Sequence, residues 1–445
     1  MKLLAKGIFT LAISLSIMLT STRGNCEATV NDGNGNIKNI IFLIGDGMGV
    51  SFTSGYRYLK DNPATIELES TEFGQYLVGQ QTTFPNDPRH NVTDSAASAT
   101  AMATGIKTYN GAIGIGNDHS KLKSVLEAAK EKGKGTGLVA TAQITHGTPA
   151  AFGAHVTQRK NMSAIADDYF QDRVNGDHKI DVLLGGGADW FIRSDRNLVD
   201  EFVKDGYSYV SNLNEMKEDH STQVLGLFAK GGLPKMIDRP NDVPSLANMT
   251  ASALERLNKI DNGFFLMVEG SQIDWAAHDN DIVGVMSEME DFEKAFRVAI
   301  DFAKKDGHTL VIATADHSTG GYTIGAGGQY NWFSSVVKAV KRTPDYIAMK
   351  IAKGANVKDT LTKYIDFPLT TKEINSIQTA ARTHKIRTID NAIEEIINTR
   401  SNTGWTTKGH TGEDVNVYAY GPGSERFKGQ IDNTDHAKII FDILK

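Results

Sequence analysis

The sequence is poor in cysteine and has a deficit of positive charge. Cys26 is the only cysteine among 445 residues, so no disulfide can form within the chain. Lys and Arg number 47 against 53 Asp and Glu, and the net charge of −6 argues against nucleic acid as a specific partner. No apolar run is long enough for a transmembrane segment. The composition, 40% hydrophobic and 22% charged, is that of a globular protein with a large buried core.

The first 28 residues have the pattern of a secretory signal peptide. Two lysines precede an apolar stretch over residues 7–20, and small and polar residues follow up to Ala28. We expect cleavage after Ala28 and an exported protein, periplasmic or secreted, that comprises residues 29–445. The removed segment carries a net charge of +2, so the net charge of −6 becomes about −8. Lipid anchoring at Cys26 is the alternative, for which Arg23-Gly24-Asn25 is a poor lead-in.

Short, continuous apolar runs alternate with amphipathic stretches along the rest of the chain. The runs are Ile40–Ile44, Leu138–Ala140, Val182–Leu184, Phe264–Val268, Leu310–Ala313 and Val415–Tyr420, and the stretches are Leu122–Lys132, Asn161–Gln171, Met249–Ile260 and Val283–Lys304. Such runs fit strands that are buried on both faces. The alternation predicts an α/β fold with a doubly wound, mostly parallel sheet flanked by helices on both faces. Residues of about 320–405 break this rhythm and are interpreted as an insertion, with a second small domain as the alternative.

Acidic and imidazole side chains lie next to these runs. Asp46, Glu269 and the pair Asp316-His317 follow strands, and His410 lies just ahead of Val415–Tyr420. Because ligands bind at the carboxyl edge of a parallel sheet, we expect these residues to form one polynuclear metal site. A lone histidine is more often structural, but several such features together favour a metal site.

Three further segments point to chemistry, and each has a plainer alternative. Asp274 and His278 are four residues apart, so on a helix they share a face and can bind one zinc ion; a solvated helix face is the alternative. Ser95 would begin a helix of small residues, where it can attack phosphorus, or Asp94 and Ser95 only cap that helix. Arg159 can grip two phosphate oxygens, or it is a surface residue.

Several segments together resemble the alkaline phosphatases. They are FLIGDGMG, VTDSAASATAMATGIKTYNGAIG, HGTPAAFGAHVTQRK, VEGSQIDWAAH, TADHSTGG and GHTGED, and they follow the family's order from about residue 38 to the C-terminus. The insertion before His410 matches least, and by analogy it is a crown-like or surface loop.

The resemblance implies a role for each of these residues. Ser95 is the expected nucleophile and Arg159 the phosphate clamp. The expected metals are two zinc ions and one magnesium ion. Their implied ligands are Asp274, His278 and His410 for the first zinc, Asp46, Asp316 and His317 for the second, and Asp46, Thr148 and Glu269 for magnesium. The first zinc would activate water and stabilise the leaving oxygen, and the second would lower the pKa of Ser95.

Two positions depart from the best-known bacterial pattern. His146 stands where an aspartate helps to hold magnesium, and Trp275 stands where a lysine reaches the phosphate through water. The resulting expectation is an exported phosphomonoesterase of low substrate selectivity that acts at alkaline pH through a phosphoserine intermediate. A homodimer is expected by analogy with the family. The alternatives are a phosphodiesterase or sulfatase-like hydrolase on the same metal scaffold, and a non-catalytic zinc- or phosphate-binding protein.

Overall fold

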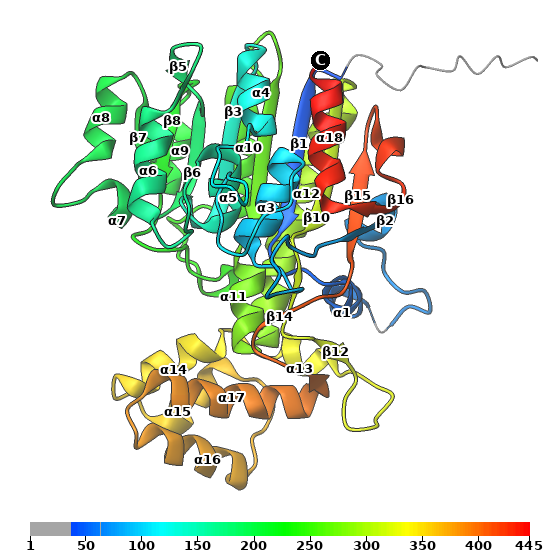
Figure 1. Ribbon diagram of the computed structural model, residues 1–445. Helices are drawn as coiled ribbons and strands as arrows, with labels where there is room; N and C mark the ends of the chain where they lie inside the picture. The colour runs from blue at the N-terminus through cyan, green and yellow to red at the C-terminus, as the bar shows by residue number, and fades with distance from the viewer. Residues whose placement is uncertain (1–36, 63) are drawn as a thin grey trace, which may run out of the picture.

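A ten-stranded sheet forms the centre of the protein in a computed structural model that describes residues 37–62 and 64–445 (Figure 1). The expected signal peptide, its cleavage site and Cys26 lie outside the described residues. The strand order is β16-β2-β15-β10-β1-β9-β3-β6-β8-β7. Every neighbouring pair is parallel except the two pairs that β15 makes, with β10 and with β2. The predicted doubly wound, mostly parallel sheet is confirmed.

The apolar runs of the sequence are the central strands. The sheet consists of β1 (Asn39–Gly45), β2 (Leu77–Thr82), β3 (Gly135–Gln143), β6 (Val182–Gly186), β7 (Ser208–Val210), β8 (Val224–Leu227), β9 (Phe264–Gly270), β10 (Thr309–Ala315), β15 (Val415–Tyr420) and β16 (Gly429–Asp432). All residues of β1, β9 and β10 are buried, as expected for strands covered on both faces. The strands that the sequence did not reveal, β2, β7, β8 and β16, lie at or next to the two edges of the sheet.

Helices cover both faces because alternate strand residues point to opposite sides. Ile40 and Phe42 of β1 pack into one apolar cluster, and Ile41 and Leu43 pack into the other. The first cluster includes residues of α3 (Ser95–Thr104), α4 (Val125–Glu131), α5 (Gly147–Gly153), α6 (Met162–Gln171), α8 (Leu198–Lys204) and α18 (Asn433–Ile443), and the second includes residues of α1 (Val50–Lys60), α10 (Leu246–Leu257), α11 (Gln272–Asp279) and α12 (Ile282–Asp306). Each predicted amphipathic stretch corresponds to one of these helices.

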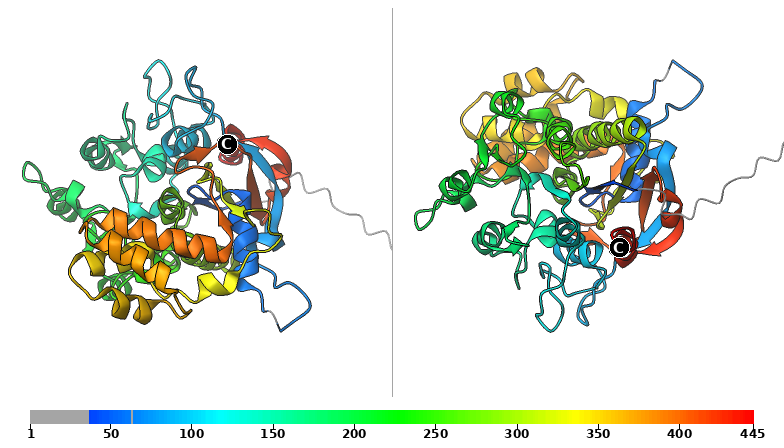
Figure 2. Two further views of the ribbon diagram at one scale, coloured as in Figure 1. Left: turned by 90° about the horizontal axis from the view of Figure 1, so that it is seen from below. Right: turned by 90° about the horizontal axis from the view of Figure 1, so that it is seen from above.

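A separate group of helices lies below the carboxyl ends of the parallel strands (Figure 1). It comprises α13 (Ser334–Lys338), α14 (Pro344–Ala352), α15 (Val357–Tyr364), α16 (Thr371–Ala381) and α17 (Ile386–Ser401). The short strands β12 (Thr323–Ile324) and β13 (Thr403–Gly404) pair where the chain enters and leaves this group. The view from below in Figure 2 shows α17 in front of the sheet. Buried residues of α14 and α17 belong to the same apolar cluster as one face of the sheet, so the group packs directly on the central fold.

Within the described residues, no helix has the length and apolar character needed to cross a bilayer.

Candidate active site

Three carboxylates come together because their strands are neighbours in register. In the sheet, Ile44 of β1 is level with Glu269 of β9, and Gly45 is level with Ala315 of β10, so Asp46 and Asp316 leave their strands side by side. All three carboxylates are fully buried. Gly47, at a φ of 70°, donates its N–H to Asp316 Oδ1 at 2.9 Å. A side chain at Gly47 would collide with Asp274 and Thr319, so only glycine fits this turn.

His410 lies near the carboxyl ends of the parallel strands because β15 is antiparallel to its neighbour β10. The residues that lead into an antiparallel strand lie where the parallel strands end, so a histidine ahead of β15 joins ligands that follow β1, β9 and β10. A short antiparallel pair, β11 (Ser318–Thr319) with β14 (His410–Thr411), sets Thr319 opposite His410. The His317 and His410 rings stack with centroids 3.6 Å apart.

Helix α11 carries Asp274 and His278 on one face, as their spacing predicts. Asp274 Oδ2 lies 3.3 Å from His278 Nε2, which lies 3.1 Å from His410 Nε2. Thr319 Oγ1 donates to Asp274 Oδ1 at 2.5 Å and lies 3.3 Å from His317 Nδ1. Sequence reasoning missed Thr319 as a residue that orients two others. Its position two residues after His317 was the available signal.

Ser95 is the first residue of α3, and Asp94 caps that helix. Asp94 Oδ1 accepts hydrogen bonds from the N–H groups of Ala97 and Gly111, each at 3.0 Å. Every residue of α3 is buried, as the run of small side chains allows. Ser95 Oγ lies 3.2 Å from His317 Nε2 and 3.4 Å from Asp46 Oδ1, so its hydroxyl faces the carboxylate and imidazole cluster.

Arg159 lies beside the start of α3. Its Nη1 donates to Asp94 Oδ2 at 3.0 Å, and its Nη2 lies 3.0 Å from His146 Nε2. Burial alone would lower the pKa of Arg159, but Asp94, Asp46 and Asp274 together raise it, so the guanidinium stays charged. A guanidinium has five N–H donors, and these contacts leave others free for an anion. Arg159 is therefore not an isolated surface residue.

His146 is neutral at any pH near neutrality. Burial and the neighbouring Arg159 lower its pKa to about 3. Because the guanidinium can only donate, Nε2 of His146 accepts and the ring proton is on Nδ1. The Trp275 ring meets the His146 ring edge to face, with centroids 5.5 Å apart. Both departures from the common bacterial pattern therefore lie next to the proposed phosphate clamp.

The cluster is electrostatically unsatisfied without a cation. Burial, together with repulsion between the carboxylates, raises the pKa of Asp46 well above its usual value, that of Asp316 to about 6 and that of Glu269 to about 7. The buried atoms without a hydrogen-bond partner include Asp46 Oδ2, Thr148 Oγ1, Glu269 Oε1, Asp316 Oδ2 and His146 Nδ1. Each orphaned buried group costs about 1–3 kcal/mol, so their convergence fits metal binding.

Three groups of side chains have ligand atoms close enough together to hold one ion each. They are Asp46 with Asp316 and His317, Asp274 with His317 and His410, and Asp46 with His146 and Glu269. The first is the set expected for the second zinc. In the second, His317 takes the place expected for His278, which is partly exposed and adjacent to His410. In the third, His146 joins the carboxylates, and Thr148 begins α5 nearby.

The fold and the site define an α/β protein with a buried serine beside candidate metal sites. A family model described as alkaline phosphatase matches residues 37–445. Alkaline phosphatase 3 of Bacillus subtilis is 63% identical over 454 residues, which cover 100% of this chain and 98% of that protein. A cold-active alkaline phosphatase of Shewanella sp. has a TM-score of 0.87 at 41% identity and covers 92% of this chain and 100% of its own. The chain belongs to the alkaline phosphatase family.

The chain is accordingly an enzyme, a phosphoric monoester hydrolase, rather than a non-catalytic binding protein. One further solved structure is a TAB5 alkaline phosphatase in which a histidine is changed to aspartate, with Mg bound in its M3 site. It has a TM-score of 0.68 at 30% identity and covers 92% of this chain and 98% of its own.

Proposed function

We propose that this protein is an exported alkaline phosphatase of low substrate selectivity that hydrolyses phosphate monoesters through a phosphoserine at Ser95. The observation that carries the proposal is the position of the Ser95 hydroxyl. It begins α3 beside Asp46 and His317, and the preceding residue, Asp94, binds the Arg159 guanidinium. A phosphoryl group at Ser95 would meet both the free N–H donors of α3 and a fixed positive charge.

The reaction has two displacements at phosphorus. Ser95 Oγ forms a bond to phosphorus as the bond to the alcohol oxygen breaks, and the alcohol leaves with a proton. Water then attacks the phosphoserine, which releases inorganic phosphate and restores the Ser95 hydroxyl. Arg159 binds non-bridging oxygens throughout, while Asp94 fixes the orientation of its guanidinium at 3.0 Å.

The residues proposed to hold the metals fall into three sets. Asp274, His278 and His410 would bind one zinc ion, Asp46, Asp316 and His317 a second, and Asp46, Thr148 and Glu269 a magnesium ion. When bound, these cations would stabilise the negative charge of the attacking and leaving oxygens and favour ionisation of the Ser95 hydroxyl. The orphaned carboxylate oxygens of Asp46, Asp316 and Glu269 support this assignment.

His146 would support the magnesium site indirectly. Its Nδ1 carries the proton, because Nε2 accepts from Arg159, so it can donate to a water or an oxygen ligand of the ion. Magnesium prefers oxygen ligands and retains water readily. The ion would therefore be held more weakly than with an aspartate at this position.

Export through an N-terminal signal and assembly as a homodimer are also proposed. The pattern of residues 1–28 supports export. The dimer is proposed by analogy with the alkaline phosphatase family. Mass determination of the N-terminus of the mature protein would distinguish cleavage after Ala28 from lipidation at Cys26. Light scattering would give the oligomeric state.

The central test is hydrolysis of 4-nitrophenyl phosphate before and after long dialysis against EDTA. We expect turnover to vanish on chelation and to return with Zn²⁺ and Mg²⁺, together with a fall in melting temperature in the metal-free protein. Full turnover in excess EDTA would refute the zinc assignment. No turnover of any monoester by the metal-loaded protein would refute the proposed reaction.

A further inference from the structure

A cavity of about 470 Å³ lies between the central fold and the group of helices below it. Its walls include Leu233, Lys235, Gln272, Trp275, Asp345 and Met349. The central fold contributes the loop around Lys235 and one side of α11, and α14 contributes the opposite wall. The cavity is therefore formed only when both parts are packed together.

Helix α11 places this cavity next to the active site. Gln272, Trp275 and Asp279 line the cavity and are three and four residues apart, so they form one face of the helix. Asp274 and His278 project from a different face of the same helix toward His410. The Trp275 ring belongs to both places, since it lines the cavity and touches the ring of His146 beside Arg159. Trp275 is therefore the residue through which the cavity adjoins the Arg159 side of the candidate site.

Two charged groups in the cavity are open to a ligand. The Asp345 carboxylate is exposed and has no hydrogen bond or ion pair with any other described residue. The Lys235 ammonium is mostly enclosed, with its nearest carboxylate oxygens 3.7 Å away on Asp281 and 3.8 Å away on Asp279. These separations exceed hydrogen-bond length, so the N–H donors of Lys235 are available.

The other two carboxylates of the lining are already engaged. Asp279 pairs with Arg387, and Asp238 accepts from Thr343 Oγ1. The lining thus contains one lysine and three aspartates, a net negative charge that disfavours an anionic leaving group.

We propose that this cavity is a leaving-group subsite for polyhydroxylated phosphate monoesters, with sugar phosphates as the substrate class. Carboxylates accept hydrogen bonds from hydroxyl groups, an ammonium donates to them, and an indole face packs against the C–H face of a sugar ring. Asp345, Lys235 and Trp275 supply these three elements around one space. This proposal rests on the proposed function and narrows it, because it adds a preference among monoesters.

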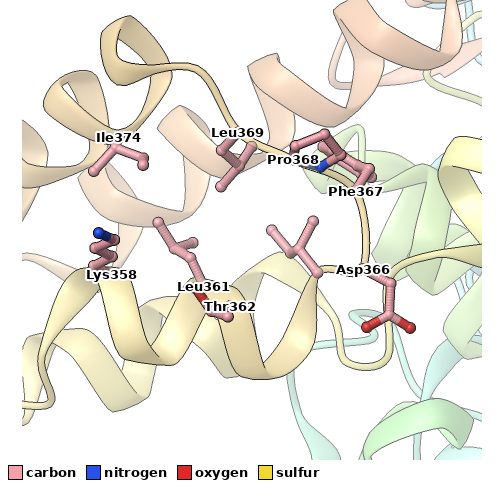
Figure 3. Close-up of a pocket in the computed structure, with 9 residues that line it drawn as sticks. Lys358, Leu361, Thr362, Asp366, Phe367, Pro368, Leu369 and Ile374 are labelled. Atoms are coloured by element: carbon pink, nitrogen blue, oxygen red, sulfur yellow. The ribbon is translucent and has the colours of Figure 1, made fainter.

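A cavity of about 500 Å³ within the lower helices has Lys358 and Asp366 among mostly apolar lining residues. Figure 3 shows Leu361 of α15 facing Leu369 and Ile374 across it. None of the candidate active-site residues lines that cavity.

The test compares kcat/KM for three substrates: glucose 6-phosphate, its carboxylated counterpart 6-phosphogluconate, and methyl phosphate, whose leaving group cannot enter the cavity. In the wild-type, metal-loaded protein we expect kcat/KM for glucose 6-phosphate to exceed kcat/KM for 6-phosphogluconate. In Asp345→Ala the ratio of glucose 6-phosphate to methyl phosphate should fall roughly tenfold, as for one lost charge-assisted hydrogen bond. The same substitution should reduce the difference in kcat/KM between glucose 6-phosphate and 6-phosphogluconate.

Two further variants sharpen the result. Asp359→Ala removes an exposed carboxylate from α15, outside the cavity, and should leave the substrate ratios unchanged. Met349→Trp fills the cavity and should lower the ratio of glucose 6-phosphate to methyl phosphate. Unchanged ratios in both Asp345→Ala and Met349→Trp would overturn the subsite while leaving the phosphatase intact. A protein that hydrolyses none of the three substrates would instead contradict the proposed function.

Discussion

Asp94 holds Arg159 at 3.0 Å with one carboxylate oxygen and caps the helix that begins with Ser95 with the other. The proposed phosphate clamp and the proposed nucleophile are thus oriented by a single side chain. Asp94 does cap the helix, as the capping interpretation predicts, and this does not exclude the functional interpretation, which stays a prediction.

Substitution at Asp94 should separate these two roles. Asp94→Asn keeps an oxygen that can accept from Ala97 N–H, so the melting temperature should change little, while the loss of charge beside Arg159 should lower kcat/KM. Asp94→Ala should lose activity and also about 0.5–2 kcal/mol of stability. Thermal melts and kinetics of the two variants provide the measurement. Equal stability losses in both would show that the cap is not what Asp94 contributes.

Arg159→Ala should cost roughly 2–4 kcal/mol in transition-state binding of a monoester, because a charged, bidentate contact disappears. A phosphodiester has fewer free anionic oxygens, so its transition-state binding should weaken less in Arg159→Ala. The ratio of kcat/KM for 4-nitrophenyl phosphate and its diester counterpart, in wild type and variant, measures the difference. Equal losses for both substrates would contradict the clamp and revive the phosphodiesterase interpretation.

Ser95→Ala should abolish the phosphoenzyme while metal binding persists. Acid quench with labelled phosphate should trap the label in the wild type and in Ser163→Ala, a control on the partly exposed helix α6, but not in Ser95→Ala. Residual turnover by direct attack of water is compatible with this prediction. Label recovered from the Ser95→Ala protein would mean that the nucleophile is another residue.

The pair His146 and Trp275 should favour rapid release of product. A neutral imidazole and an indole replace an aspartate and a lysine, so phosphate should bind weakly, turnover should be high and added magnesium should activate. His146→Asp combined with Trp275→Lys should tighten phosphate binding and slow turnover. The measurement is the inhibition constant of phosphate for the wild type and for the double variant at one pH. No tightening in the double variant would refute this account.

Glu394 should make the fold less stable as the pH rises from about 4.5 to about 9. Burial and the neighbouring Asp390 raise the pKa of Glu394 from 4.5 to about 9, and its Oε1 has no hydrogen-bond partner. A carboxyl group with a folded-state pKa above its unfolded value contributes stability that is fully present below the unfolded pKa and is lost as pH rises through the folded pKa. Glu394→Gln should therefore match the wild type near pH 4 and melt increasingly higher than the wild type as the pH rises to about 9.

The neighbouring residue supplies the control for this prediction. Glu395→Gln alters an exposed carboxylate one position along α17 and should leave the pH dependence of melting unchanged. If the Glu394→Gln and wild-type melting curves stay parallel up to pH 10, the buried carboxylate is not the cause of alkaline destabilisation.

The central strands and the nearby acidic residues could be predicted because each signal is local. Ile40–Ile44 is apolar at every position, as a strand buried on both faces must be, and Asp46 follows it directly. Glu269 likewise lies at the end of the apolar strand β9, and Asp316 directly follows β10. The i, i+4 spacing of Asp274 and His278 likewise needs only the helical repeat. Their individual roles in metal binding stay predictions.

Relationships across the sheet could not be predicted in this way. Nothing within Val415–Tyr420 shows that β15 runs antiparallel to β10, because direction is set by the chain that connects them. The strand β2, next to the edge of the sheet, is partly exposed and polar, so it lacks a continuous apolar run. The contact of Thr319 with Asp274 and the stacking of His317 on His410 join segments that are distant in sequence, so no local pattern encodes them.

The reversed strand β15 has a consequence for the biosynthesis of the enzyme. Asp46, Ser95 and the residues of β9 and β10 can gather on the parallel sheet early, but His410 arrives only with one of the last segments to be synthesised. Pairing of such distant segments is also slow, because a long loop must close first. A growing chain therefore carries Ser95, the proposed nucleophile, long before it carries His410, so the candidate site is complete only once β15 has joined the sheet.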